Sequence, residues 1–186
     1  YELSGNLGLT FLSGDAPAVA RVQRASGHYL NRLDQPHIRY DPTRTDLNGA
    51  QIVGNLSKIA GRHWLWTNSI MIESPEFDPF DFGRLNYAGD LTSTHRLTYR
   101  ETRPGKYLRA YTVQATLVPY WYFDTNLGVR YNLSDNNSVT FRNFWVGSVN
   151  ITRFFRGNDA QMTRGGPSMG TPLGWNWTGT LRNSTG

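Results

Sequence analysis

The chain has 186 residues, enough for one domain with a sizeable core, and its aromatic content of 13% with only 18% charged residues excludes intrinsic disorder. The absence of Cys excludes disulfides and thiolate metal sites. No apolar run approaches the ~20 residues of a membrane helix, and the Lys and Arg residues behind the net charge of +5 are spread out, which argues against a nucleic-acid partner.

Alternating apolar and polar residues predict β-strands along most of the chain, because successive side chains of a strand point to opposite faces. The N-terminus, Tyr-Glu-Leu-Ser-Gly, begins inside such a pattern without a leader sequence, so we expect a mature form or a fragment. In the first half we expect four strands, over residues 2–13, 18–33, 49–60 and 62–73. A turn at 14–17 and loops at 34–48 and 74–83 separate them.

The second half continues the same pattern. We expect strands over residues 90–100, 106–118, 121–133, 139–153 and 173–182. The turns between them lie at 103–105 and at Ser134-Asp135-Asn136-Asn137, and residues 157–172 form a Gly/Pro-rich connection. No segment longer than a turn has the period of a helix.

The alternation is clearest in the segment 121–133, which divides into two rows. Its apolar row comprises Trp121, Phe123, Thr125, Leu127, Val129, Tyr131 and Leu133, and its polar row comprises Tyr122, Asp124, Asn126, Gly128, Arg130 and Asn132. We interpret these rows as the lipid face and the water face of one long strand.

Strand length favours a membrane protein. The chain contains about nine predicted strands of roughly 11–15 residues, whereas strands of globular proteins average about 5–6 residues and membrane barrels need about 9–11. We therefore predict an all-β fold, an antiparallel up-and-down β-barrel of the bacterial outer membrane that occupies residues 1–186 as a single domain, or a large fragment of one. An odd strand number is unusual for such barrels, so either one strand is miscounted or a further barrel segment or partner protein completes the sheet.

Five of the six tryptophans lie on apolar rows, most of them near strand ends, as in the aromatic girdles of membrane barrels. They share the apolar rows of their strands, and they are Trp64, Trp66, Trp121, Trp175 and Trp177. We expect them to face lipid; the alternative is a platform that stacks on a carbohydrate ligand.

Charged residues on the polar rows are the candidates for a functional surface. They are Asp90, Arg96, Arg100, Asp124, Arg130, Arg142 and Arg182. In a barrel they would line the lumen and set solute selectivity. The alternative is an internal ladder of salt bridges that only fills the barrel.

An acidic loop is the one metal candidate. Its closely spaced carboxylates, Glu73, Glu76, Asp78 and Asp81, are the hard oxygen ligands that Ca²⁺ takes. The spacing does not match an EF-hand, and the alternative is a folded loop with Phe77, Phe80 and Phe82 packed on the barrel rim.

Catalytic motifs are absent. The four His residues form no ligand pair for zinc, and the chain has neither GxSxG nor a Walker motif. The glycine-rich TRGGP segment at 163–167 leads toward a strand rather than a helix, so we expect a connection rather than a phosphate site. We predict no enzyme activity and no cofactor.

Four ordered segments resemble a bacterial family of unknown function: GHYLNRLDQPHIRYDPTRTDLNG (27–49), GRHWLWTNSIMIESPEFDPFDFGRLNYAGD (61–90), FRNFWVGSVN (141–150) and MTRGGPSM (162–169). The family's members carry an N-terminal carbohydrate-binding module similar to family 9, followed by a large outer-membrane-type β-barrel. This chain resembles the barrel region but is shorter and lacks the module, so the resemblance implies a piece of the barrel.

The predicted function is that of a porin-like channel, transporter or surface anchor in the outer membrane, in contact with its lipid. The family resemblance implies a link to carbohydrate handling. The alternative is a soluble extracellular β-sandwich that binds glycans.

Overall fold

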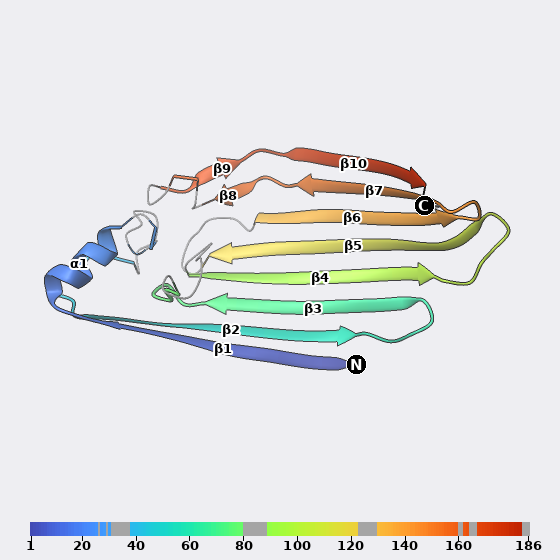
Figure 1. Cartoon of the computed structure of the whole chain (residues 1–186). Coiled ribbons are helices and arrows are strands. Elements are labelled where there is room, and N and C mark those ends of the chain that lie inside the picture. The colour runs from blue at the N-terminus through green and yellow to red at the C-terminus, as the bar shows by residue number, and fades with distance from the viewer. Residues whose placement is uncertain are drawn as a thin grey trace.

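The computed structural model describes residues 1–25, 27–28, 30, 38–79, 89–122, 130–159, 162–163 and 167–183. Eight strands form one antiparallel sheet in the order β1-β2-β3-β4-β5-β6-β7-β10 (Figure 1). Their bounds are β1 Glu2–Ser13, β2 Asp46–Lys58, β3 Trp64–Glu73, β4 Asp90–Glu101, β5 Leu108–Tyr122, β6 Arg130–Phe141, β7 Trp145–Phe154 and β10 Gly174–Asn183. The remaining elements are the helix α1 (Ala16–Arg24) and a small two-stranded sheet of β8 (Gly157–Asp159) and β9 (Met169–Thr171).

Connections differ sharply between the two ends of the sheet. At one end, which we call the turn end, short segments join the strands, over residues 59–63, 102–107 and 142–144. At the other, which we call the helix end, three connections are long, over residues 14–45, 74–89 and 155–173, and two of these carry α1 and the β8–β9 pair. The fourth connection at this end, residues 123–129, lies outside the described residues. Figure 1 shows α1 and the β8–β9 pair together at this end.

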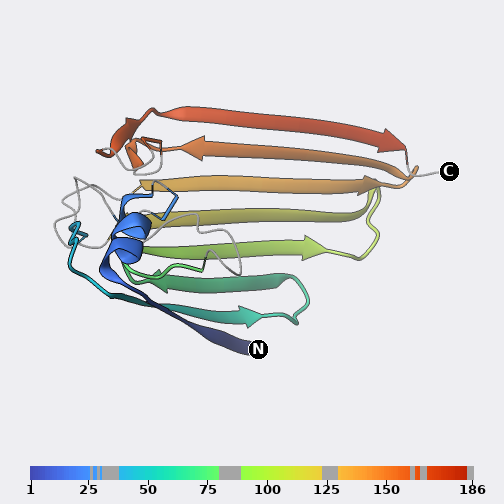
Figure 2. The same cartoon turned by 60° about the vertical axis from the view of Figure 1, so that its left-hand side comes forward.

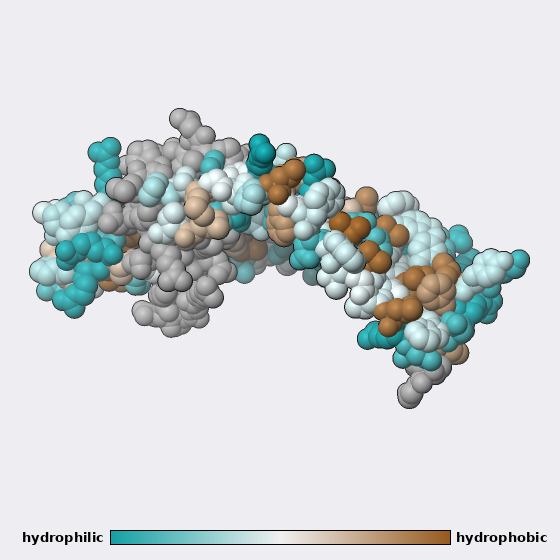
Figure 3. All heavy atoms as spheres, turned by 90° about the horizontal axis from the view of Figure 1, so that it is seen from above, coloured by the Kyte–Doolittle hydropathy of each residue, from teal (hydrophilic) through white to brown (hydrophobic). Residues whose placement is uncertain are grey.

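The strand register separates the side chains into two continuous faces, because residues paired across antiparallel strands point to the same side. Leu7 pairs with Ile52, which in turn pairs with Ile72, and Leu117 pairs with Leu133. One side of the sheet, which we call the apolar face, therefore collects exposed side chains from all eight strands, among them Leu3, Leu7, Ile52, Ile70, Leu97, Val113, Leu117, Leu133, Val149 and Leu181. Figure 3 shows hydrophobic side chains gathered over the strands away from α1.

The opposite side, the polar face, carries mainly Ser, Thr, Asn, Gln and charged residues. Arg96 pairs with Thr67 and with Thr116, which pairs with Ser134. The predicted two-row pattern therefore holds for the sheet as a whole.

The segment 18–33 does not form the predicted strand. Residues 18–24, together with the two residues before them, form the helix α1 instead. Pro17 stands in the first turn, where a missing N–H costs nothing, and the carbonyl of Asp15 accepts hydrogen bonds from the N–H groups of Ala18 and Val19. Val19, Ala20 and Gln23 are buried on one side of the helix. The spacing of these buried residues is helical. Over only nine residues it also resembles a weak alternation of apolar and polar residues, which explains the wrong prediction.

The predicted hairpin turn at Ser134–Asn137 is also wrong. These residues lie in the middle of β6, where they pair with β5 on one side and β7 on the other. Two neighbouring strands satisfy the backbone groups of this polar segment, so its turn-like composition does not decide its conformation. The turn comes later, at residues 142–144, where Phe144 adopts a positive φ of 65°. The predicted single strand 121–133 is accordingly two, and its centre, 123–129, lies outside the described residues.

The sheet is open. Within the described residues β1 and β10 have one neighbour each, so the predicted closed barrel is not shown. The eight long strands replace the nine that were expected, and the expected strand at 18–33 accounts for the difference. In the part of the chain that the structure describes, no helix is both long and apolar enough to cross a membrane.

Candidate functional site

A cap covers the polar face at the helix end, and we define it as α1 with the segments 38–45 and 74–79. The small core of the chain joins it to the sheet: Val19 of α1 and Ile38 pack with Leu47 of β2, and Leu12 of β1 lies against them. Leu12 and Leu47 are paired residues on the polar face, where they form an apolar patch among polar neighbours. Figure 2 shows α1 on one side of the sheet at this end.

The segment 74–79 is held on the same face by two glycines. A Cβ on Gly49 would lie 2.2 Å from Cα of Phe77, and a Cβ on Gly8 would touch the Phe77 ring at 3.4 Å. The backbone N–H of Asp78 donates to the hydroxyl of Thr10 at 3.2 Å. Phe77 is buried, in agreement with the expected packing of this loop, whereas Phe80 and Phe82 lie outside the described residues.

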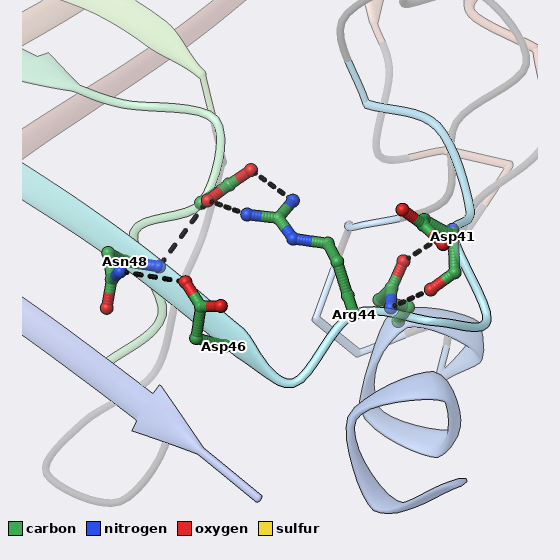
Figure 4. A network of polar contacts seen from close by, with 6 residues as sticks. Asp41, Arg44, Asp46 and Asn48 are labelled. Atoms are coloured by element: carbon green, nitrogen blue, oxygen red, sulfur yellow. Dashed lines mark hydrogen bonds and ion pairs between the residues drawn. The ribbon is translucent and has the colours of Figure 1, made fainter. Parts of the chain in front are cut away.

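Charged pairs hold the parts of the cap together. Arg44 donates two hydrogen bonds to the carboxylate of Glu76, at 2.5 and 2.9 Å (Figure 4). This paired carboxylate raises the pKa of Arg44. Asp41 accepts hydrogen bonds from the hydroxyl and the N–H of Thr43, which lower its pKa. Gln23 bonds with both backbone groups of Asp41, so α1 is fixed to the segment 38–45.

Two carboxyl groups contact each other on the polar face at the helix end of the sheet. Glu73, the last residue of β3, and Asp90, the first residue of β4, are buried, with exposed fractions of 5% and 1%. Gln51 donates to Glu73 at 2.5 Å, and Asp90 is a further hydrogen-bond partner of Glu73. Burial raises the pKa of Glu73, and the hydrogen bonds with Gln51 and Asp90 oppose this shift. We call Glu73 and Asp90 the carboxyl pair.

An ion pair lies on the same face across the sheet. Arg130 of β6 pairs with the carboxylate of Asp159 in β8, and its guanidinium lies 4.7 Å from the centre of the Tyr120 ring. A Cβ on Gly157 would approach Arg130 to 2.8 Å, so the glycine permits β8 to pack directly on this residue. The carboxyl pair and the Arg130–Asp159 pair thus border the polar face at the helix end.

Further cations lie along the polar face toward the turn end. Arg96, Arg100 and Arg182 are on this face, as the sequence pattern predicted, and within the described residues none of the three forms an ion pair. An internal ladder of salt bridges is therefore not seen at these positions. Asp90 and Arg130 also lie on this face, where Asp90 contacts Glu73 and Arg130 pairs with Asp159.

Arg142 does not lie on the strand face predicted for it. It follows β6 in the turn 142–144, where its Nε donates to the carbonyl of Gly105 at 2.9 Å and its N–H donates to Tyr107. It therefore joins two neighbouring turns instead of lining the polar face. Asp124 lies outside the described residues.

The five tryptophans expected to share a face do so. Trp64, Trp66, Trp121, Trp175 and Trp177 all lie on the apolar face. Near the turn end, the Trp64 ring packs edge-on against Tyr99 at 4.9 Å, and Tyr99 stacks on Tyr111 at 5.9 Å. Near the helix end, Arg153 lies between the rings of Phe155 and Trp175, at 4.7 and 5.0 Å. Aromatic side chains therefore border the apolar face at both ends.

The acidic residues proposed to bind Ca²⁺ are not brought together. Glu73 contacts Gln51, Glu76 is paired with Arg44, and Asp78 is paired with His28. No group of three or more potential metal ligands occurs among the described residues, and Asp81 lies outside them. The carboxylates of this loop hold the cap to its neighbours.

Sequence reasoning missed the carboxyl pair and the cap. Glu73 and Asp90 are separated by a long connection, and their contact depends on the pairing of β3 with β4. Both residues stand at the boundary between an alternating strand and a loop, which was the one available signal. His28 and Asp78 are 50 residues apart and carried none.

A comparison with known proteins gives one match that includes part of this site. A family model described as a domain of unknown function, DUF5916, matches residues 25–165. No curated protein and no solved structure matches the chain. The matched range includes β2 to β7, the carboxyl pair and the cap segments 38–45 and 74–79, but not α1, and it agrees with the resemblance to a family of unknown function. The chain belongs to the DUF5916 domain family.

Proposed function

We propose that this sheet is a major part of an outer-membrane β-barrel, with its apolar face toward lipid and its polar face toward a water-filled interior. The observation that carries the proposal is the apolar face, which extends across all eight strands and is largely exposed in the described structure. Polar residues interrupt it at Asn68 and His95 and at Asp135 and Asn137. Exposed apolar surface of this extent marks an interaction with a membrane or a protein. Further strands of a partner or of the same protein would pair with the β1 and β10 edges.

The height of the apolar face fits a bilayer. On β4, Leu91 is level with Trp121 near the helix end, and Tyr99 is level with Trp64 near the turn end. At about 3.4 Å per residue, this stretch of β4 is about 27 Å long. A strand tilted by about 40° would span about 21 Å, close to the apolar band of about 25 Å in outer-membrane barrels.

The connections support the same proposal. Outer-membrane barrels have short turns at one end and longer loops at the other. The turn end and helix end of this sheet differ in that way. The helix-end cap lies on the polar face, so in a closed barrel it would narrow the mouth of the interior.

The proposed role is that of a channel, transporter or surface anchor. Arg96, Arg100 and Arg182 would place positive charge along the interior, and rings of Arg or Lys favour anions in pores. In planar bilayers we expect the assembled protein to conduct anions in preference to cations. Arg96→Glu should shift the reversal potential toward cations, whereas Arg103→Glu, in a short turn, should leave it unchanged. Conductance without a preference for anions would contradict the proposal that these arginines line the interior.

The direct test of the membrane proposal is the behaviour of the full chain without detergent. We expect the purified protein to be monodisperse in detergent, to aggregate on its removal, and to remain with liposomes through flotation. A chain that stays monodisperse in buffer at the same concentration would overturn the proposal.

A second candidate is an extracellular glycan-binding module, and one observation favours it. Trp175 and Trp177 lie two residues apart on the edge strand β10, with exposed fractions of 62% and 77%. Exposed rings in this arrangement can stack on successive sugars. Titration of a buffer-stable chain with oligosaccharides would support this candidate if Trp177→Ala abolished binding and Trp145→Ala did not.

A further inference from the structure

A hollow on the apolar face reaches the turn end between β5 and β10. Its volume is about 640 Å³, and its walls include Tyr111, Val113, Phe141 and Leu181. Gly147 and Gly179 lie at its floor, and a Cβ on Gly179 would meet only the carbonyl oxygen of Ser148, at 4.0 Å. Gly179 therefore leaves room for an apolar group beside the strands.

Three cations lie where this hollow meets the turns. Arg109 follows the lining residue Leu108, Arg142 follows the lining residue Phe141, and Lys106 lies in the turn before β5. The Arg109 guanidinium is 4.3 Å from the centre of the Phe144 ring, and Lys106 Nζ is 5.1 Å from that of Tyr107. Within the described residues none of these three cations forms an ion pair.

The two turns that carry the cations are fixed to each other. Arg142 Nε donates to the carbonyl of Gly105, and the N–H of Arg142 donates to that of Tyr107. The positive charges and the aromatic rings beside them are thus held at one end of an apolar hollow. This arrangement combines a site for a negative group with a site for a hydrocarbon chain.

We propose that this hollow binds an anionic glycerophospholipid, with an acyl chain along the β6–β7–β10 surface and the headgroup phosphate at Lys106, Arg109 and Arg142. The inference rests on the proposed function, because it requires the apolar face to meet lipid. It goes further by assigning one lipid class to one place on that face. The charge of the three cations selects an anionic headgroup over a zwitterionic one.

The test is native mass spectrometry of the full chain in detergent, with added dioleoyl phosphatidylglycerol or dioleoyl phosphatidylcholine. We expect phosphatidylglycerol to be retained preferentially. The double variant Lys106→Ala/Arg109→Ala should weaken its retention about 30-fold, since each cation near an anionic headgroup contributes a similar free energy of binding. The matched double variant Lys58→Ala/Arg62→Ala removes two cations from the β2–β3 connection and the strand residue before it, at the same end, and should leave retention unchanged.

A second pair of variants tests the hollow itself. Gly179→Phe fills it and should reduce retention of phosphatidylglycerol, whereas Gly54→Phe, at a separate hollow on the apolar face, should not. Retention without preference for phosphatidylglycerol, or equal loss in the two cation variants, would overturn the lipid site. Liposome flotation of each variant separates this result from failure of the membrane proposal, because a chain that floats with lipid but shows no preference refutes the lipid site alone.

Discussion

The two faces of this sheet share one backbone and differ in the kind of side chain that predominates. Leu117 and Thr116 are neighbours on β5, yet Leu117 pairs with Leu133 and His95 on the apolar face, while Thr116 pairs with Arg96 and Ser134 on the polar face. The protein's small buried core and its cap lie on the polar face, and the apolar face is left uncovered in the described structure. This inversion of the usual pattern of a water-soluble protein is the basis of the proposal that the apolar face meets lipid.

The largest expected effect comes from placing a charge on the apolar face. Leu117→Arg should block insertion into liposomes, because Arg at the bilayer midplane costs about 2–4 kcal/mol. Gln114→Arg, on the polar face of the same strand, should insert normally. Flotation of both variants checks this, and equal flotation would remove the distinction between the faces.

The next effect concerns the apolar patch and glycines that hold the cap on the polar face. Gly49→Ala places a Cβ 2.2 Å from Cα of Phe77, so the segment 74–79 must move away from β2. We expect a loss of about 1–3 kcal/mol in unfolding free energy, the usual cost of overpacking. Faster proteolysis within 74–79 should accompany it. Gly54→Ala, where a Cβ meets only Ile70 at an ordinary 3.5 Å, serves as the control.

A smaller effect should follow loss of the ion pair in the cap. Arg44 and Glu76 are partly exposed, with side-chain exposed fractions of 32% and 28%, so their two hydrogen bonds should contribute about 0.5–1 kcal/mol. A double-mutant cycle with Arg44→Met and Glu76→Gln measures this coupling by denaturant unfolding. A coupling energy near zero would show that apolar packing alone holds the cap.

The smallest effect is a change in pH dependence. Hydrogen bonds from Thr43 lower the pKa of Asp41, so they stabilise the cap above the ordinary carboxyl pKa. This contribution is lost as the pH falls through the lowered pKa. Thr43→Val should bring the pKa of Asp41 back toward its ordinary value in an NMR titration. An unchanged pKa would assign the shift to another neighbour.

Most of the sheet was predictable because alternation is a local signal. The strands that became β1 to β4 and β10 were placed within a few residues of their bounds, and the five tryptophans were correctly put on one face. Each strand of this sheet presents one row to each face, so every segment repeats the same pattern.

Errors arose where local composition and tertiary pairing disagree. Ser134–Asn137 has the residues of a turn, yet its backbone pairs on both sides, and the amide of Asn137 donates a hydrogen bond to Asp135 at 2.9 Å. The true turn contains Phe144 at positive φ, a position where composition favours Gly or Asn. The carboxyl pair and the cap depend on contacts between distant segments, which no local pattern records.

The most direct test of the central claim is a scan of single cysteines along β5, because the native chain has no Cys and each label is therefore unique. Spin labels at 113, 115 and 117 should be accessible to oxygen in a bilayer and protected from a water-soluble nickel reagent, and labels at 112, 114 and 116 should show the reverse. Such a period of two would place the apolar face in lipid. Equal exposure of both sets to the nickel reagent would contradict the account.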